Sequence, residues 1–320
     1  MAKTRYATDK GLIARMGATM FLIGLVFTAF ILAIVLLLTR FTAVSSDGII
    51  FIAVLAGVAV SFGSYFWSDR IALATAGARL VTPEQAPELH GVIDRLCALA
   101  DMPKPRVAIA PADMPNAFAT GRSSKVAVLC VTQGLLKRLD RNELEGVIAH
   151  EMSHVAHKDV AVMTIASFLG IMAGLLVRFA FYGELFGGGG GRGRGRVGND
   201  QNSAAVLFLV MLVGIVVYAI SFLLIRLLSR YRELSADRSG ALLTGQPSAL
   251  ASALVKVSSE MAKIPTRDLR AAEPLNAFYF APALTTRRGE MSLSTLFSTH
   301  PPLEKRLRAL DEISKQLSSR

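Results

Sequence analysis

Cysteine is scarce in this chain: Cys97 and Cys130 are the two among 320 residues. Both stand in apolar surroundings, and their separation has none of the close spacing of a zinc-binding cysteine pair. Two such thiols do not make a disulfide framework, so a reducing compartment is expected. We expect both cysteines to be core residues, and any metal site must then be built from other side chains.

Acidic residues are also few, since 24 Asp and Glu face 35 Lys and Arg and leave a net charge of +11. Such a surplus suits either nucleic acid or anionic lipid. The sequence contains no nucleic-acid-binding motif, and its aromatic residues are not interleaved with the basic ones, which argues against nucleic acid as a partner. Because the hydrophobic content of 52% is high for a soluble protein, membrane lipid is the expected partner.

Charge is nearly absent from four apolar stretches, each about long enough to cross a bilayer. They are residues 17–38, 48–67, 160–181 and 204–225. A cleavable signal peptide is the rival interpretation of the first stretch, but its apolar core is too long for one. A transporter would need charged or broken segments within its spans, and here only Arg178 and the flanking Arg226 occur, both near span ends. The sequence predicts a multi-pass membrane protein.

The sidedness of the chain follows from its short charged segments. Four basic residues precede the first span and one follows it: Lys3, Arg5, Lys10 and Arg15 before, Arg40 after. The positive-inside rule then places the amino terminus in the cytoplasm of a cell whose inner membrane holds the protein. Paired crossings return residues 68–159 and 226–320, with the carboxyl terminus, to that same side. A buried or shallow hairpin of residues 160–181 and 204–225 is the alternative, and it leaves this side unchanged.

Residues 183–203 are a stretch of low complexity in which a glycine run is followed by arginines alternating with glycine. This composition is typical of a flexible linker, and an RGG-like nucleic-acid segment is the sharper alternative. If residues 160–181 and 204–225 both cross the membrane, three of these arginines lie outside, against the positive-inside rule. We accept that exception because the two polar segments on either side must meet to build one site.

The motif His150-Glu151-Met152-Ser153-His154 lies within a helical pattern that begins at Asp140, an N-cap with Glu143 placed for a capping box. Histidines four apart share one helix face, so both imidazoles can bind one Zn²⁺ while Glu151 serves the bound water as general base. The motif fixes only three positions. A helix with two half-buried histidines and a solvated glutamate is therefore the alternative.

A third ligand is needed, because catalytic zinc usually has three protein ligands and one open position. Glu233 and Asp237 stand one turn apart on a later helix, where Glu233 can complete the zinc site and Asp237 can accept from a ligand imidazole. Gly240 and Ala241 are small enough for close helix packing. The alternative is an ion-pair network of the two carboxylates with Arg230, Arg232 and Arg238.

The segment before the motif alternates between short helices and strands. We expect helices at 88–99 and 132–139 and strands at 106–110 and 125–131, which are rich in Val, Ile and Leu. His90 is expected on the surface of the first helix. His157 stands where longer zinc-protease motifs need glycine, so we interpret it as structural.

Together these residues resemble the integral-membrane gluzincins, and most closely the HtpX group. The matching residues are His150 to His154, Glu233 to Asp237 with Arg238 and Gly240, Asn116, Ala117, Phe118 and Ala119, and Ser298 to Pro302 with Arg306. The resemblance implies a zinc endopeptidase that cuts membrane or misfolded proteins at the cytoplasmic face. It also implies that Asn116 to Ala119 form an edge strand beside the cleft, where substrate backbone can pair. His300 becomes a candidate stabiliser of the oxyanion, with a core histidine at a helix start as the alternative.

Two other functions remain as alternatives. A prenyl-protein endopeptidase of the CAAX type shares the motifs but carries more membrane spans. A non-enzymatic scaffold with structural zinc would need four protein ligands, and neither a fourth ligand nor a use for Glu151 is evident.

The predicted fold is therefore mainly α: a multi-pass membrane protein with a gluzincin-like α+β protease domain, a small sheet with an edge strand, and two zinc-binding helices. Its predicted domains are a membrane hairpin at 1–67, a cytoplasmic lobe at 68–159, a second hairpin at 160–225 and a helical cytoplasmic lobe at 226–320.

Overall fold

The computed structural model describes residues 10–41, 69–121, 123–159, 200–263 and 300–319, with isolated positions between 55 and 67 and at 162–163. Most of the predicted spans 48–67 and 160–181, and the Gly/Arg-rich linker up to residue 199, lie outside the described residues. The chain divides into two compact units. One comprises Met1–Met16, Tyr65–Val162 and Arg226–Arg320, and the other comprises Gly17–Ser64 and Met163–Ile225.

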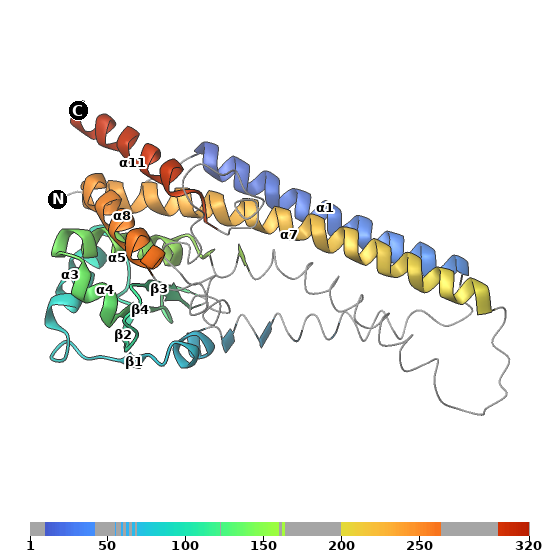
Figure 1. Cartoon of the computed structure of the whole chain (residues 1–320), viewed down its shortest axis with the longest axis horizontal. Coiled ribbons are helices and arrows are strands. Elements are labelled where there is room, and N and C mark those ends of the chain that lie inside the picture. The colour runs from blue at the N-terminus through green and yellow to red at the C-terminus, as the bar shows by residue number, and fades with distance from the viewer. Residues whose placement is uncertain are drawn as a thin grey trace. The chain divides into compact units, whose positions relative to one another are not determined.

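Two described helices are long and apolar enough to cross a membrane, α1 (Lys10–Phe41) and α7 (Asp200–Thr244) (Figure 1). Large apolar side chains such as Phe21 on α1 and Leu223 on α7 are more than half exposed, as expected of a lipid-facing surface. These helices correspond to the predicted spans 17–38 and 204–225. Both extend beyond the predicted ends, because helical backbone continues through the polar flanks of each apolar stretch.

The first unit contains a four-stranded mixed sheet in the order β1-β2-β4-β3. The strands are β1 (Arg79–Leu80), β2 (Arg106–Ala110), β3 (Ala117–Thr120) and β4 (Val128–Thr132). The central pair β2 and β4 is parallel, and both outer pairs are antiparallel. Gly121 turns the chain after β3 with φ +120°, where a side chain would collide with the backbone of Ala127. Strand β3 is an edge strand, because it comes last in the strand order.

Apolar side chains alternate between the two faces of this sheet, as the period of a strand requires. Val107 and Leu129 face a core shared with α3 (Pro87–Ala100) and α5 (Arg141–Ala156). Ala108 and Cys130 face the opposite cluster, which is covered by the helical turns at residues 69–75. The two cysteines are buried in different clusters, which confirms their prediction as core residues.

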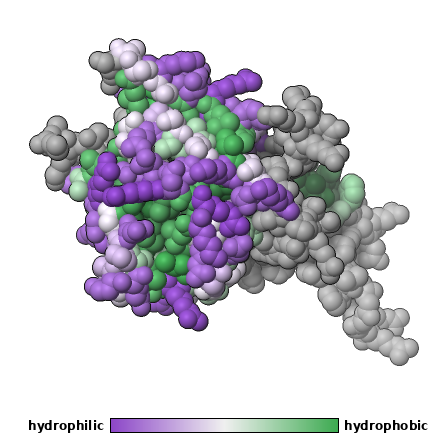
Figure 2. All heavy atoms as spheres, turned by 60° about the vertical axis from the view of Figure 1, so that its left-hand side comes forward, coloured by the Kyte–Doolittle hydropathy of each residue, from purple (hydrophilic) through white to green (hydrophobic). Residues whose placement is uncertain are grey.

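Further helices complete the first unit, namely α4 (Gln133–Arg138), α8 (Pro247–Lys263) and α11 (Leu303–Ser318). Helix α8 packs against both α5 and α11. Figure 2 shows that hydrophilic side chains cover much of the described surface on this side of the molecule, with apolar ones visible between them. The exposed placement expected for His90 is wrong. That side chain is buried, with Nε2 3.1 Å from the carbonyl oxygen of Val81, because the chain leading from β1 packs over this face of α3.

Candidate metal centre

Helix α5 carries the histidine motif, and its beginning is fixed by the predicted capping box. The Asp140 side chain accepts from the backbone N–H of Glu143 at 2.9 Å, and the Glu143 carboxylate accepts from the backbone N–H of Asp140 at 3.0 Å. Glu143 also accepts hydrogen bonds from Ser252 and Lys256 on α8 at 2.6 and 2.7 Å. A helix start anchored in this way fixes both the axial position and the rotation of the motif.

Helix α7 approaches α5 very closely at the motif. A Cβ atom on Gly240 would lie 2.9 Å from the backbone nitrogen of His150, a separation that no side chain tolerates. Glycine at this position lets the two backbones meet, as the small residue predicted. The approach brings the preceding two turns of α7, with Glu233 and Asp237, alongside the histidines.

Three side chains converge at this contact. The ligand atoms of His150, His154 and Glu233 all lie within 4.8 Å of one another. The Nε2 atoms of the two histidines are 3.3 Å apart, and the Glu233 oxygens lie 3.7 Å from His150 Nε2 and 3.5 Å from His154 Nε2. The sequence placed these residues on two separate helices, and the structure brings them together.

His150 is held from behind by a buried carboxylate. Asp237 Oδ1 lies 2.9 Å from His150 Nδ1, and both Asp237 oxygens accept from the guanidinium of Arg306 at 2.6 and 2.7 Å. Burial lowers the pKa of His150, but Asp237 and Glu233 outweigh it and raise that pKa to about 9. The two carboxylates therefore favour positive charge at this imidazole.

His154 has a carboxylate partner of its own, which the sequence analysis missed. Its Nδ1 makes a short contact with Asp159 Oδ2, and the same oxygen lies 3.0 Å from Arg232 Nε. Asp159 stands five residues beyond His154, just past the end of α5, and is buried. An acidic residue soon after the motif was the available signal. For Arg232 the sequence predicts no role except in the alternative ion-pair network.

Glu151 lies between the histidines in sequence and faces the edge of the sheet. Its Oε2 accepts a hydrogen bond of 3.1 Å from the backbone N–H of Ala119 on β3. Burial raises the pKa of the Glu151 carboxyl above its usual value, which is the direction that a general base for neutral pH requires. The N–H of Ala119 thus points away from β4 and toward the histidine helix.

The remaining predicted residues lie near this cluster. His300 is buried, with Nδ1 3.0 Å from Glu233 Oε2, so it adjoins the candidate third ligand. Its role at an oxyanion stays a prediction. Asn116 is buried at the start of β3, where its backbone exchanges hydrogen bonds with Thr132. Ala117 and Phe118 are also buried, so what β3 offers at its open edge is chiefly backbone.

The donor set fits zinc. Two imidazole nitrogens and one carboxylate oxygen face one another, while carboxylates contact the opposite nitrogen of each ring and fix the side that points inward. No other group of three such side chains stands out among the described residues.

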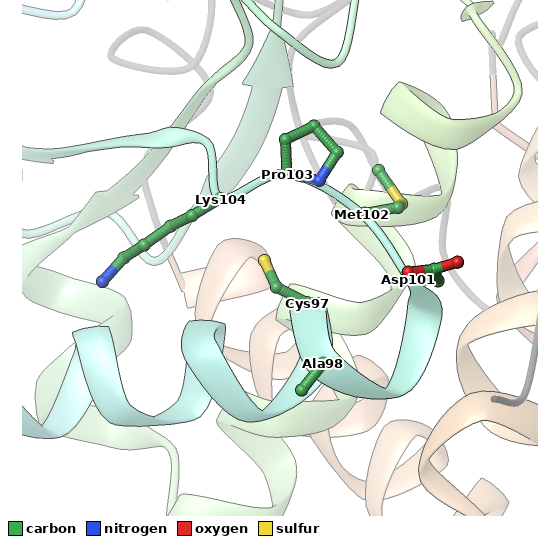
Figure 3. Close-up of a pocket in the computed structure, with 6 residues that line it drawn as sticks. All are labelled: Cys97, Ala98, Asp101, Met102, Pro103 and Lys104. Atoms are coloured by element: carbon green, nitrogen blue, oxygen red, sulfur yellow. The ribbon is translucent and has the colours of Figure 1, made fainter. Parts of the chain in front are cut away.

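A separate hollow lies at the carboxyl end of α3 (Figure 3), lined by Cys97, Ala98, Asp101, Met102, Pro103 and Lys104. Burial raises the pKa of the Cys97 thiol to about 11, so it is protonated and unreactive at neutral pH. Lys104 pairs with Asp94 at 2.8 Å. This hollow offers no comparable chemistry.

Comparison with known proteins gives one consistent result. The model of peptidase family M48 matches residues 83–314. Protease HtpX homolog 1 of Streptomyces coelicolor is 55% identical over 316 residues, covering 98% of this chain and 97% of that protein. Protease HtpX homolog of Moorella thermoacetica is 46% identical over 319 residues, covering 99% of each.

Among solved structures, the fold is similar to that of Ste24p from S. mikatae, with a TM-score of 0.51 and 17% identity over 97% of this chain and 68% of that one. At that identity the likeness speaks for the fold alone. The family model covers most of the chain, and the relatives match its full length. The chain therefore belongs to peptidase family M48 and is a metalloprotease of the HtpX type, carried on a membrane protein with at least the two apolar helices described above.

Proposed function

We propose that this protein is a zinc-dependent endopeptidase that hydrolyses peptide bonds of membrane or misfolded proteins at the cytoplasmic face of the inner membrane. The observation that carries the proposal is the convergence of His150, His154 and Glu233, with the carboxylate of Glu151 on the same helix and facing an edge strand. Two nitrogens and one oxygen leave an open position on zinc, which distinguishes a catalytic from a structural site.

Zinc bound here would supply a water with a pKa of about 7 and a Lewis acid for the substrate carbonyl. Glu151 accepts the proton of the attacking water and later donates it to the leaving amine nitrogen. Its buried position keeps the carboxylate close to the reacting atoms and away from bulk solvent. His300, which contacts Glu233, is our candidate for a second group at the developing oxyanion.

Strand β3 is our candidate substrate platform. It is one of the two outer strands of the sheet, and Ala119 directs its N–H toward Glu151 and away from β4. An extended peptide paired there would bring its backbone past the proposed base. Recognition through backbone atoms carries no sequence information, which suits a protease of misfolded proteins. Asn116 stands at the start of this strand, where its amide could hold substrate backbone.

The alternatives receive less support. A scaffold has no use for Glu151, and we find no fourth ligand among the described residues. A CAAX-type prenyl-protein endopeptidase would be expected to carry more spans. The relatives matched along their full length are HtpX homologues instead, while this chain covers only 68% of the solved Ste24p chain.

The central test is Glu151→Gln, which removes the base and keeps every proposed ligand. We expect purified Glu151→Gln protein to hold about one zinc per chain and to lose casein cleavage by at least about 100-fold, the scale of general-base catalysis. The native protein treated with chelator should lose both zinc and activity. Cleavage by Glu151→Gln at close to the native rate would show that the assigned mechanism is wrong.

A second test concerns the side of the membrane. The native cysteines are buried, so the unmodified chain serves as the unlabelled control for an impermeant thiol reagent. Ser259→Cys and Ser318→Cys, both at exposed positions, should label only after the membrane is opened. Asn199→Cys should label from outside if the second hairpin crosses fully, and should stay silent if it is shallow. Labelling of Ser259→Cys from outside would move the protease lobe to the exterior face.

A further inference from the structure

We infer that Asp159, held by Arg232, is a positioning residue that orients His154 toward the metal and fastens the end of α5 to the helix of the third ligand. The inference rests on the proposed ligand set and adds to it. It assigns a role to two residues, one just beyond the histidine motif and one just before Glu233.

The contacts form a short chain of charge-assisted interactions. Asp159 Oδ2 contacts His154 Nδ1 on one side and lies 3.0 Å from Arg232 Nε on the other. With Nδ1 engaged by the carboxylate, the ring presents Nε2 toward His150 Nε2 and Glu233. A carboxylate on the outer nitrogen also raises the basicity of a ligand imidazole. The arrangement therefore selects both the orientation and the electronic character of His154.

Burial separates this arrangement from an ordinary surface ion pair. The side chain of Asp159 is only 2% exposed and that of Arg232 12% exposed. An exposed pair gains little, because water and salt screen it. A buried carboxylate without partners would be costly, and Asp159 avoids that cost because it lies between a histidine and an arginine. This placement suits a residue that holds His154 in position.

The local backbone is shaped to deliver Asp159 to this place. Helix α5 ends with His157 as its C-cap, and Lys158 then adopts the left-handed conformation with φ +57°. That conformation is uncommon for a residue with a side chain. It redirects the chain at the end of α5, and Asp159 then lies against His154.

The partner of Asp159 links the two helices that carry ligands. Arg232 directly precedes Glu233 on α7, so the ion pair joins the end of α5 to the turn of α7 that supplies the third ligand. Loosening of this pair should therefore affect the orientation of His154 and its distance from Glu233 together. Among the described residues, Asp159 Oδ1 has no hydrogen-bond partner, so both functional contacts depend on one oxygen.

The test uses the full-length protein in detergent and measures metal binding without reference to proteolysis. Asp159→Asn keeps the size of the side chain but removes its charge. We expect zinc affinity to fall by about 10–100-fold, as for other carboxylates behind ligand histidines, with faster loss of zinc to a chelator. The d–d absorption spectrum of the Co²⁺-substituted protein should also shift, since the geometry at His154 changes. A purely structural role would lower the melting temperature and leave both readouts unchanged.

Matched controls separate the possible failures. Asp94→Asn removes a carboxylate that also pairs with a cation, Lys104, but far from the histidines in sequence and contacts, and it should leave zinc affinity and the Co²⁺ spectrum unchanged. Arg232→Gln breaks the same ion pair from the α7 side and should cause a smaller loss of zinc affinity. It keeps the inference testable if Asp159→Asn does not fold. His154→Ala checks the ligand assignment itself.

The outcomes are distinct. If His154→Ala loses zinc while Asp159→Asn and Arg232→Gln both bind as the native protein does, the ligand set stands and our inference is wrong. If His154→Ala binds zinc normally, the ligand set and the inference fail together. If zinc binding follows the expected pattern but the native protein cleaves no peptide, the proposed function fails and the positioning role remains.

Discussion

His150 and His154 are one helical turn apart on α5, yet the structure supports their outer ring nitrogens in different ways. Asp237 and Arg306 stand behind His150, whereas Asp159 and Arg232 stand behind His154. The first support joins α5, α7 and α11, which are far apart in sequence. The second is built from the end of α5 and the residue beside Glu233. His150 thus depends on contacts among three helices, and His154 on the turn after α5 and its ion pair with α7.

The two supports also differ in strength. Arg306 and Asp237 are each about 1% exposed and form a two-pronged hydrogen-bonded pair. Arg232 is 12% exposed and approaches one oxygen of Asp159. Paired charge-assisted hydrogen bonds are stronger and more directional than a single contact. Damage to the His150 support should therefore cost more than damage to the His154 support.

The largest effect is expected where the two supports meet. Glu233 faces both histidines, with oxygens 3.7 Å from His150 Nε2 and 3.5 Å from His154 Nε2. Glu233→Ala removes one of three proposed ligands, and zinc per chain measured by atomic absorption should fall to near zero. Glu304→Ala, at an exposed carboxylate on α11, is the control and should bind zinc normally. A full zinc content in Glu233→Ala would mean that the third ligand lies elsewhere.

The next largest effect is expected of Arg306→Ala, which removes the hydrogen-bond donor to Asp237 behind His150. It leaves Asp237 as a buried carboxylate without its guanidinium, a change that costs about 3–5 kcal/mol when a buried pair loses one partner. The melting temperature should drop clearly, and zinc should bind more weakly because Asp237 no longer holds His150. Arg232→Ala is the matched change in the other support and should lower the melting temperature less. Equal losses in the two variants would contradict the ranking.

The sequence predicted the histidine helix well because its signals are local. The capping box at Asp140 and the spacing of the histidines both act within a turn or two of the residues that they affect. Glu233 and Asp237 could be chosen because one-turn spacing on a helix is as regular as the motif itself. The strands expected at 106–110 and 125–131 were predictable from their Val, Ile and Leu content and correspond to β2 and β4, whereas the edge position of β3 was expected from the resemblance alone and β1 was not predicted.

Other features depend on contacts that no local pattern records. Asp159 was missed because Lys158 turns the chain in a conformation usually left to glycine, so the sequence shows an acidic residue after the motif but not the turn that brings it to His154. His90 was assigned to the surface because its burial arises from the packing of the segment around Val81. The contact of His300 with Glu233, 67 residues away, likewise exists only in the folded chain.

A direct comparison of the two carboxylates gives a smaller and sharper effect. Asp237→Asn and Asp159→Asn make the same chemical change behind the two histidines. Both should weaken zinc by about 10–100-fold, with Asp237→Asn toward the upper end because it also breaks the two-pronged bond with Arg306. Competition with a zinc chelator of known affinity measures the difference. A larger loss in Asp159→Asn would reverse our view of which support dominates.

The smallest expected effect lies in the turn that positions Asp159. The Lys158 side chain is exposed, so substitutions there act chiefly through the backbone at φ +57°. Lys158→Gly should be neutral or slightly stabilising, since glycine adopts this conformation freely. Lys158→Val loses the same ammonium group but forces a β-branched residue into the left-handed region, at a cost of about 1–2 kcal/mol.

If the turn serves to hold Asp159, Lys158→Val should release zinc to a chelator several-fold faster than Lys158→Gly, while Lys158→Gly matches the native protein. The contrast between the two variants isolates the backbone, because the lost charge is common to both. Equal release rates in the two variants would show that Asp159 finds His154 without this turn. The position of Asp159 would then rest on its ion pair with Arg232 alone.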